Sequence, residues 1–237
     1  MKKNLYIIIL SFIAIAVYAD NRQGIDFYKA GEPTIASRLF EKQLSSSPAE
    51  KPEALYYQGE IAFDENKTFE ALANYQKGWT TFPDYAYNKV GEGKVLLKTD
   101  KSTAQKAFDA AIKINKKDAS VYVAIAKAYS MNGMEAEAQA ALDNAKKYNA
   151  NDPAIYLYEG DLLISKDKPG DAAGRYEQAI HFDPACKEAY IKYANVYQGV
   201  TPTLSIEMLQ KVISNDPDYL PAYCHLGNIY SLQGNYP

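Results

Sequence analysis

Cysteine, histidine and tryptophan are scarce in this chain of 237 residues, which contains two, two and one of them. The cysteines Cys186 and Cys224 have no neighbours at a metal-ligand spacing. Neither His181 nor His225 has a serine, cysteine or carboxylate partner at a spacing that would assemble an acid, a base and a nucleophile. These absences predict a chain that is not an enzyme and that holds no metal and no cofactor.

The chain also lacks an excess of positive charge. It has 26 Lys and Arg residues and 29 Asp and Glu residues, which gives a net charge of −3. Binding to a phosphate backbone usually needs a basic patch, so this balance argues against a nucleic-acid partner. No glycine-rich phosphate loop follows a strand pattern, and no small-molecule substrate is evident.

Only the N-terminus carries a long apolar run. Lys2 and Lys3 precede a stretch from Leu5 to Val17 that is apolar except for Ser11. A basic start, a short apolar core and a small residue at Ala19 are the layout of a secretory signal peptide. A membrane span needs about 20 apolar residues. We therefore predict a signal peptide over residues 1–19 that is cleaved before Asp20. The protein is then expected to be exported to the periplasm of a Gram-negative bacterium and to contact the membrane only transiently, through the signal peptide. An uncleaved inner-membrane anchor is the alternative.

The rest of the chain repeats a pattern of two small residues, an aromatic residue and a proline. Its clearest copies have internal spacings of 12, 4 and 8 residues, and they are Gly24/Ala36/Phe40/Pro48, Gly59/Ala71/Tyr75/Pro83 and Gly160/Ala172/Tyr176/Pro184. Anchoring each unit on its first small residue gives Gly24, Gly59, Glu92 (or Gly91), Ala126, Gly160, Ala194 and Gly227. Steps of 33 to 35 residues between these anchors are typical of a helix–turn–helix solenoid.

Two segments match a known repeat closely. Tyr223-x2-Leu226-Gly227-x2-Tyr230 follows the first half of the tetratricopeptide repeat (TPR) pattern, with Tyr in place of Trp. Ala172-x3-Tyr176-x2-Ala179 with Pro184 follows the second half. The chain thus resembles TPR proteins, and the resemblance implies an all-α, right-handed solenoid of antiparallel helix pairs.

The units divide residues 20–237 into six full repeats and a truncated seventh. Their approximate bounds are 20–50, 52–85, 86–118, 119–152, 153–186, 187–219 and 220–237. Turns between paired helices are expected at Ala30-Gly31, Glu65-Asn66, Asn132-Gly133, Lys166-Asp167 and Gln233-Gly234. Because a full unit separates the two cysteines, we expect two free thiols. Because the seventh unit stops after its first helix, we expect the protein to continue beyond Pro237.

The resemblance implies that the first helix of each unit lines a concave face, one residue after the packing positions. The candidate partner-binding residues on that face are Tyr56, Glu60, Phe63, Lys89, Leu96, Lys127, Asp161, Ile164, Asn195 and Asn228. Tyr56 and Phe63 are large aromatics that the repeat pattern does not require, so we expect them to be recognition residues rather than core.

These observations favour a protein–protein interaction module in the bacterial cell envelope that binds a protein or peptide on its concave face. The alternative is a regulatory or substrate-positioning arm of a larger envelope enzyme, or of a secretion or assembly complex, whose other domain lies beyond Pro237. The identity of the partner is not encoded in any motif of the chain.

Overall fold

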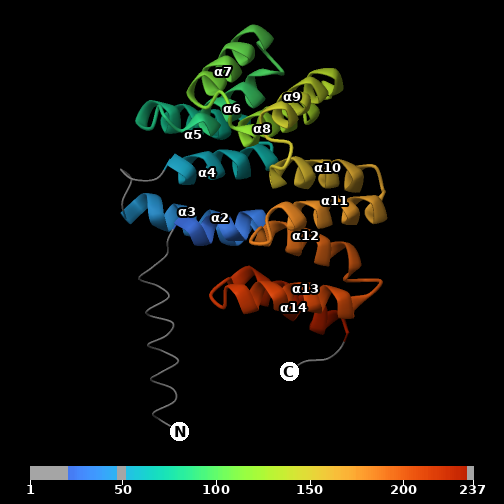
Figure 1. Ribbon diagram of the computed structural model, residues 1–237. Coiled ribbons are helices and arrows are strands. Elements are labelled where there is room, and N and C mark those ends of the chain that lie inside the picture. The colour runs from blue at the N-terminus through green and yellow to red at the C-terminus, as the bar shows by residue number, and fades with distance from the viewer. Residues whose placement is uncertain (1–20, 47–51, 234–237) are drawn as a thin grey trace.

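A computed structural model describes residues 21–46 and 52–233, and these ranges fold into thirteen helices without a strand (Figure 1). The all-α solenoid predicted from the repeat pattern is confirmed. The predicted signal peptide and the turn at Gly234 lie outside the described residues. Within the described ranges, no helix combines the length and the apolar character needed to cross a membrane.

The helices alternate between an inner set and an outer set. The inner, or A, helices are α2 (Asn21–Lys29), α4 (Pro52–Asp64), α6 (Ala86–Leu96), α8 (Ala119–Ser130), α10 (Pro153–Ser165), α12 (Lys187–Tyr197) and α14 (Leu220–Leu232). The outer, or B, helices are α3 (Pro33–Ser46), α5 (Thr68–Thr81), α7 (Lys101–Ile114), α9 (Glu135–Tyr148), α11 (Pro169–Phe182) and α13 (Pro202–Asn215). Each of the first six A helices packs against the B helix that follows it.

Glycine lets a B-helix ring sit directly on the A-helix backbone. A Cβ atom added at Gly160 would lie 2.4 Å from Cε1 of Tyr176, and one at Gly59 would lie 2.4 Å from Cε1 of Tyr75. Both rings are buried, so the small and aromatic positions of the repeat are one packing contact.

The third unit differs from its predicted register. Its ring is Phe108, and the glycine beneath that ring is Gly93, where a Cβ atom would lie 2.4 Å from Cε1. Gly91 instead contacts Tyr75 of the preceding unit, at 2.3 Å from a built Cβ to Cε1. The anchor assigned to Glu92 or Gly91 was therefore wrong, and Gly93 takes that place.

Four of the turns between paired helices share one geometry. Gly31, Asn66, Gly133 and Asp167 have positive φ angles of 86°, 61°, 70° and 56°. In each turn the next residue donates its N–H to a carbonyl five residues earlier, as Lys67 does to Ala62 at 2.8 Å. This is the Schellman motif, which satisfies the last carbonyls of a helix.

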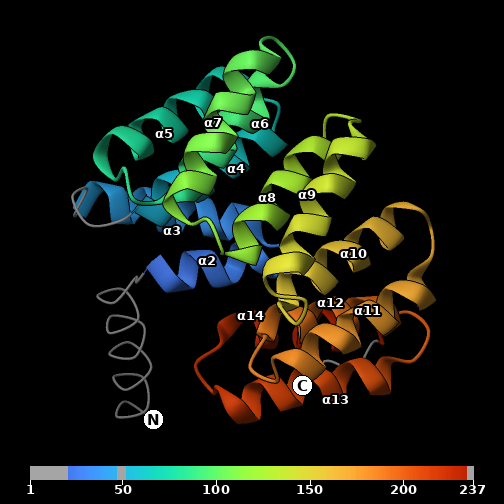
Figure 2. The ribbon, with the colours of Figure 1, turned by 45° about the horizontal axis from the view of Figure 1, so that its top comes forward.

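The array closes on itself, because its last A helix packs against its first. Figures 1 and 2 both place α2 beside the orange and red helices of the C-terminal units. At this contact, which we call the seam, His225 Nε2 lies 2.9 Å from the Ala30 carbonyl oxygen. Leu220 and Cys224 pack against the core cluster around Phe27.

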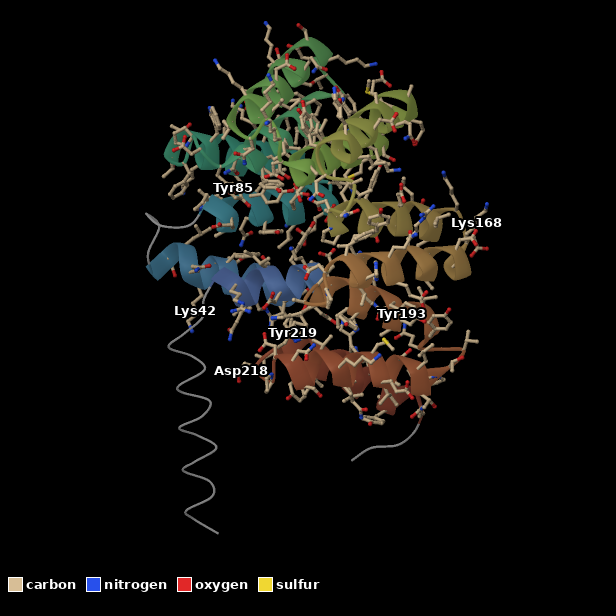
Figure 3. All side chains as sticks on the ribbon, viewed as in Figure 1. Lys42, Tyr85, Lys168, Tyr193, Asp218 and Tyr219 are labelled. Atoms are coloured by element: carbon tan, nitrogen blue, oxygen red, sulfur yellow. The ribbon has the colours of Figure 1, made fainter. Side chains whose placement is uncertain are left out.

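Charged and aromatic groups flank the seam. Arg22 pairs with Asp216 at 3.6 Å, and Lys187 forms a second, closer ion pair with the same carboxylate. The Lys187 ammonium also lies 4.6 Å from the ring of Tyr219. Tyr219 is buried and is labelled in Figure 3 between α2 and the red helices. The two ends of the array are therefore joined by apolar packing with ion pairs at its margin.

Candidate functional site

The closed array forms a partly open cavity of about 710 Å³ on its inner face. Residues of α2, α4, α6, α8, α10 and α12 line it, so six units contribute to one site. A volume of this size lies within the range of roughly 300–1,000 Å³ typical of binding pockets.

The predicted residues divide into two groups. Five of them line the cavity, namely Tyr56, Glu60, Lys127, Asp161 and Asn195. The other five, Phe63, Lys89, Leu96, Ile164 and Asn228, are not among its lining residues in the described part of the chain. Ile164 and Asn228 are exposed, and Leu96 packs against the core of the third and fourth units.

Lys89 points away from the cavity because the register of the third unit is shifted by one residue. Its ammonium lies 4.7 Å from the ring of Trp79 in α5 and pairs with Glu92. The residues of α6 that line the cavity are Tyr87, Val90, Gly91 and Lys94, and Lys94 lies one position beyond Gly93. Lys94 is the main site residue missing from the sequence prediction. Counting back the regular 12 residues from Ala104 reaches Glu92 rather than Gly93, so the spacing of the repeat did not identify Lys94.

Lys94 is buried and forms an ion pair with a predicted site residue. Its Nζ atom lies 2.7 Å from Oε1 of Glu60 and 4.2 Å from the ring of Phe63. The Tyr75 hydroxyl donates to the same Glu60 oxygen. Burial, together with the nearby Glu60 carboxylate, raises the pKa of Tyr75 well above its usual value, which keeps the hydroxyl protonated as a donor.

The same arrangement recurs three units later. Asp161 accepts a hydrogen bond from the Tyr176 hydroxyl at 2.9 Å and pairs with Lys192 at 2.9 Å. Burial alone would lower the pKa of Lys192, but the carboxylates of Asp161 and Glu188 outweigh it and raise that pKa. In both units the repeat's own aromatic ring thus fixes a cavity carboxylate that a lysine neutralises.

Tyrosine rings form one wall of the cavity over the first three units. The rings of Tyr28 and Tyr57 lie 5.0 Å apart, those of Tyr57 and Tyr56 lie 5.0 Å apart, and Tyr56 lies 6.1 Å from Tyr85. With Tyr87, these residues make up what we call the tyrosine wall. Tyr85 is labelled in Figure 3 just above α4.

The rings of Tyr56 and Phe63 contribute to packing, contrary to expectation. Tyr56 is half-buried and contacts four other tyrosine rings. Phe63 is half-buried beside the Lys94 ammonium, and both side chains pack against the core cluster that contains Tyr75. Tyr56 therefore has a structural role while also facing the cavity, and Phe63 is a packing residue.

Comparison with known proteins agrees with this architecture. Residues 21–86 match the tetratricopeptide repeat family model. The TPR family is thereby supported for the first units. A thermophilic TPR protein of Thermus thermophilus, TTC0263, is 21% identical over 74% of this chain and 95% of its own, with a TM-score of 0.50. That likeness shows the same fold.

A second solved structure is more distant. YrrB, described as a TPR protein with an unusual peptide-binding site, is 19% identical over 78% of this chain and 96% of its own, with a TM-score of 0.40. No curated protein matches the sequence.

One repeat unit presents a cation without a counterion among the described residues. Lys127 of α8 lines the cavity and is half-buried. Within residues 21–46 and 52–233, its ammonium makes no ion pair and no side-chain hydrogen bond. The other lining residues of α8 include Val123, Ala124 and Met131, so this cation sits on a largely apolar surface.

The metal-ligating and nucleophilic side chains of the described residues are dispersed rather than clustered. Among these residues, no group of three His, Cys, Asp or Glu side chains could hold a metal ion. Cys186 and Cys224 are free thiols, and burial raises the pKa of Cys186 to about 11, which makes it a poor nucleophile at neutral pH. His225 is engaged at the seam. From the described residues, the site can contribute aromatic surface, paired charges and one free cation.

Proposed function

We propose that this protein is a non-catalytic interaction module that binds a segment of a partner protein in its central cavity. The observation that carries the proposal is the cavity of about 710 Å³ lined by six TPR-like units. Its tyrosine wall supplies the kind of aromatic contact that dominates protein interfaces, and its ion pairs supply fixed polar groups. In the described residues the fold is helical throughout, so a bound segment is recognised through side chains rather than by strand pairing.

Site-specific photo-crosslinking tests this proposal. A photoreactive residue at Ala124, which lines the cavity, is compared with the same residue at Ala140, which is exposed on the outer helix α9. We expect cross-links from position 124 to converge on one segment of one partner, mapped by mass spectrometry. The proposal is wrong if position 124 captures nothing, or if position 140 captures the same segment as efficiently.

We further propose that the protein acts in the cell envelope of a Gram-negative bacterium. The support is the sequence of residues 1–19, with its basic start, short apolar run and small exit residue. N-terminal sequencing of protein from the envelope fraction should begin at Asp20. An intact Met1 would instead favour the inner-membrane anchor.

The module acts either alone or as the positioning arm of a larger envelope enzyme or assembly. Both forms use the same cavity, and they differ in whether a further domain follows Pro237. Sequencing the complete reading frame separates them.

A further inference from the structure

Most charges that line the cavity are already matched within the protein. Lys94 pairs with Glu60 at 2.7 Å, and Lys192 pairs with Asp161 at 2.9 Å. Glu188 lies 3.9 Å from both Lys192 and Lys29. These carboxylates and lysines therefore offer little free charge to a partner.

Asp64 is the remaining lining carboxylate, and it is also engaged. It accepts a hydrogen bond from the Tyr28 hydroxyl at 3.3 Å, and it lies at the exposed margin of the site. Desolvation raises the pKa of this carboxyl group, and the nearby Lys94 ammonium opposes that rise.

Lys127 is the exception to this matching. Lys127 is half-buried and lines the cavity together with Val123, Ala124 and Met131, and the described residues supply its ammonium with no counterion. A charge held on apolar surface in a partly enclosed site interacts with an added opposite charge more strongly than one in bulk water does. Among its described lining residues, the cavity thus has a single unmatched positive position.

We propose, as an extension of the function proposed above, that the bound segment places one acidic side chain on Lys127. Apolar residues flank that acidic residue and pack on the apolar surface of α8 and on the tyrosine wall. A single carboxylate fits a single ammonium. A phosphate group carries a larger charge and is usually held by several cations or by arginine forks, which this cavity does not provide among its described lining residues.

The test uses an array of nine-residue peptides, acetylated and amidated at their ends, with central Glu and varied apolar flanks. The strongest binder is then compared with its central-Gln and central-Lys analogues by fluorescence anisotropy. For the wild-type protein, we expect the Gln analogue to bind at least about tenfold more weakly, because one charge-assisted contact is lost.

Variants at position 127 assign the effect to this side chain. Lys127→Met should remove the preference for Glu over Gln, and Lys127→Arg should retain it. Lys127→Glu should favour the central-Lys peptide. Lys113→Met, on the exposed surface of the outer helix α7, is the matched control and should behave as wild type. Circular dichroism establishes that each variant is folded.

Four outcomes would overturn the inference: no peptide of the array binds, Gln binds as tightly as Glu, Lys127→Met keeps the preference, or a Gln peptide with a free carboxyl terminus binds as well as the Glu peptide. The last outcome would assign the anion to a chain end. If cross-links from Ala124 still converge on one segment, the proposed function stands while this inference fails. If Ala124 captures nothing, the proposed function itself fails.

Discussion

At the scale of single residues, the contact between a glycine and an aromatic ring governs how closely the paired helices approach. The ring edge lies where a Cβ atom would be, at 2.5 Å for Gly24 and Phe40 and at 2.4 Å for Gly160 and Tyr176. An alanine there must displace a buried ring in a closely packed core. Glycine lowers the stability of a helix relative to alanine, but it occupies these positions because no larger residue fits.

Replacing Gly160 with alanine should therefore destabilise the protein by about 1–3 kcal/mol, the usual cost of overpacking. The same substitution at Gly174 is a matched control in the same unit. Gly174 is a helical, exposed glycine with nothing within 4 Å of a built Cβ, so alanine there should stabilise by about 0.5–1 kcal/mol. Urea unfolding of the two variants measures both signs. Equal effects of the two substitutions would contradict the packing argument.

At the scale of elements, turn length sets the spacing between the small residue of the first helix and that of the second. In the third unit, Gly93 and Ala104 are 11 residues apart, whereas Gly59 and Ala71 are 12 apart. The shorter turn has no residue with positive φ, since the position that Asn66 occupies is absent. The sixth unit is shortened in the same way between Ala194 and Ser205.

The recurring pattern of the units explains what the sequence could predict, and the shortened turn of the third unit explains one of its errors. The repeat pattern located the helix pairs, and it located the turns wherever a glycine, asparagine or aspartate marked them. It placed Lys127 and Asp161 correctly on the inner helices because their units have regular anchors. It selected Lys89 and omitted Lys94 because its anchor was Glu92 (or Gly91), whereas the shortened turn places Gly93 beneath the Phe108 ring.

The left-handed turn residues support a prediction of their own. Asp167 has φ 56°, a conformation that costs an L-residue about 1 kcal/mol and glycine almost nothing. Asp167→Gly should therefore raise the stability by up to about 1 kcal/mol, whereas Gly133→Ala, at φ 70°, should lower it by a similar amount. Thermal unfolding followed by circular dichroism measures the two shifts. A loss of stability in Asp167→Gly would mean that its side chain has a role beyond the turn.

At the scale of the whole molecule, closure of the array turns a concave face into a cavity. The seam joins α2 and α14, which lie at opposite ends of the sequence. The repeat pattern did not predict this contact, because small rotations between neighbouring units accumulate over the whole array before its ends meet. Asn228 was placed on the concave face by its repeat position, but it is exposed and does not line the cavity among the described residues, while Cys224 of the same helix packs at the seam.

The seam should open when its apolar contact is made charged. Leu220 packs against the cluster around Phe27 and is the first residue of α14, where an acidic side chain suits the helix dipole. Leu220→Asp should therefore separate the two ends while leaving the helices intact. Leu232→Asp is the control, since Leu232 lies on the same helix with 74% of its surface exposed.

Two measurements follow the opening. Small-angle X-ray scattering should show a larger radius of gyration for Leu220→Asp at unchanged helical content. In a Cys186→Ser background, the Cys224 thiol should react faster with a soluble thiol reagent in Leu220→Asp than in the closed protein. Burial raises the pKa of Cys224 in the closed protein, and opening of the seam removes that burial. Unchanged scattering and unchanged thiol reactivity would mean that the seam contributes little to closure.

Opening would also divide the cavity between α2 and the later units, so the peptide that binds the wild-type cavity should bind Leu220→Asp more weakly and Leu232→Asp equally well.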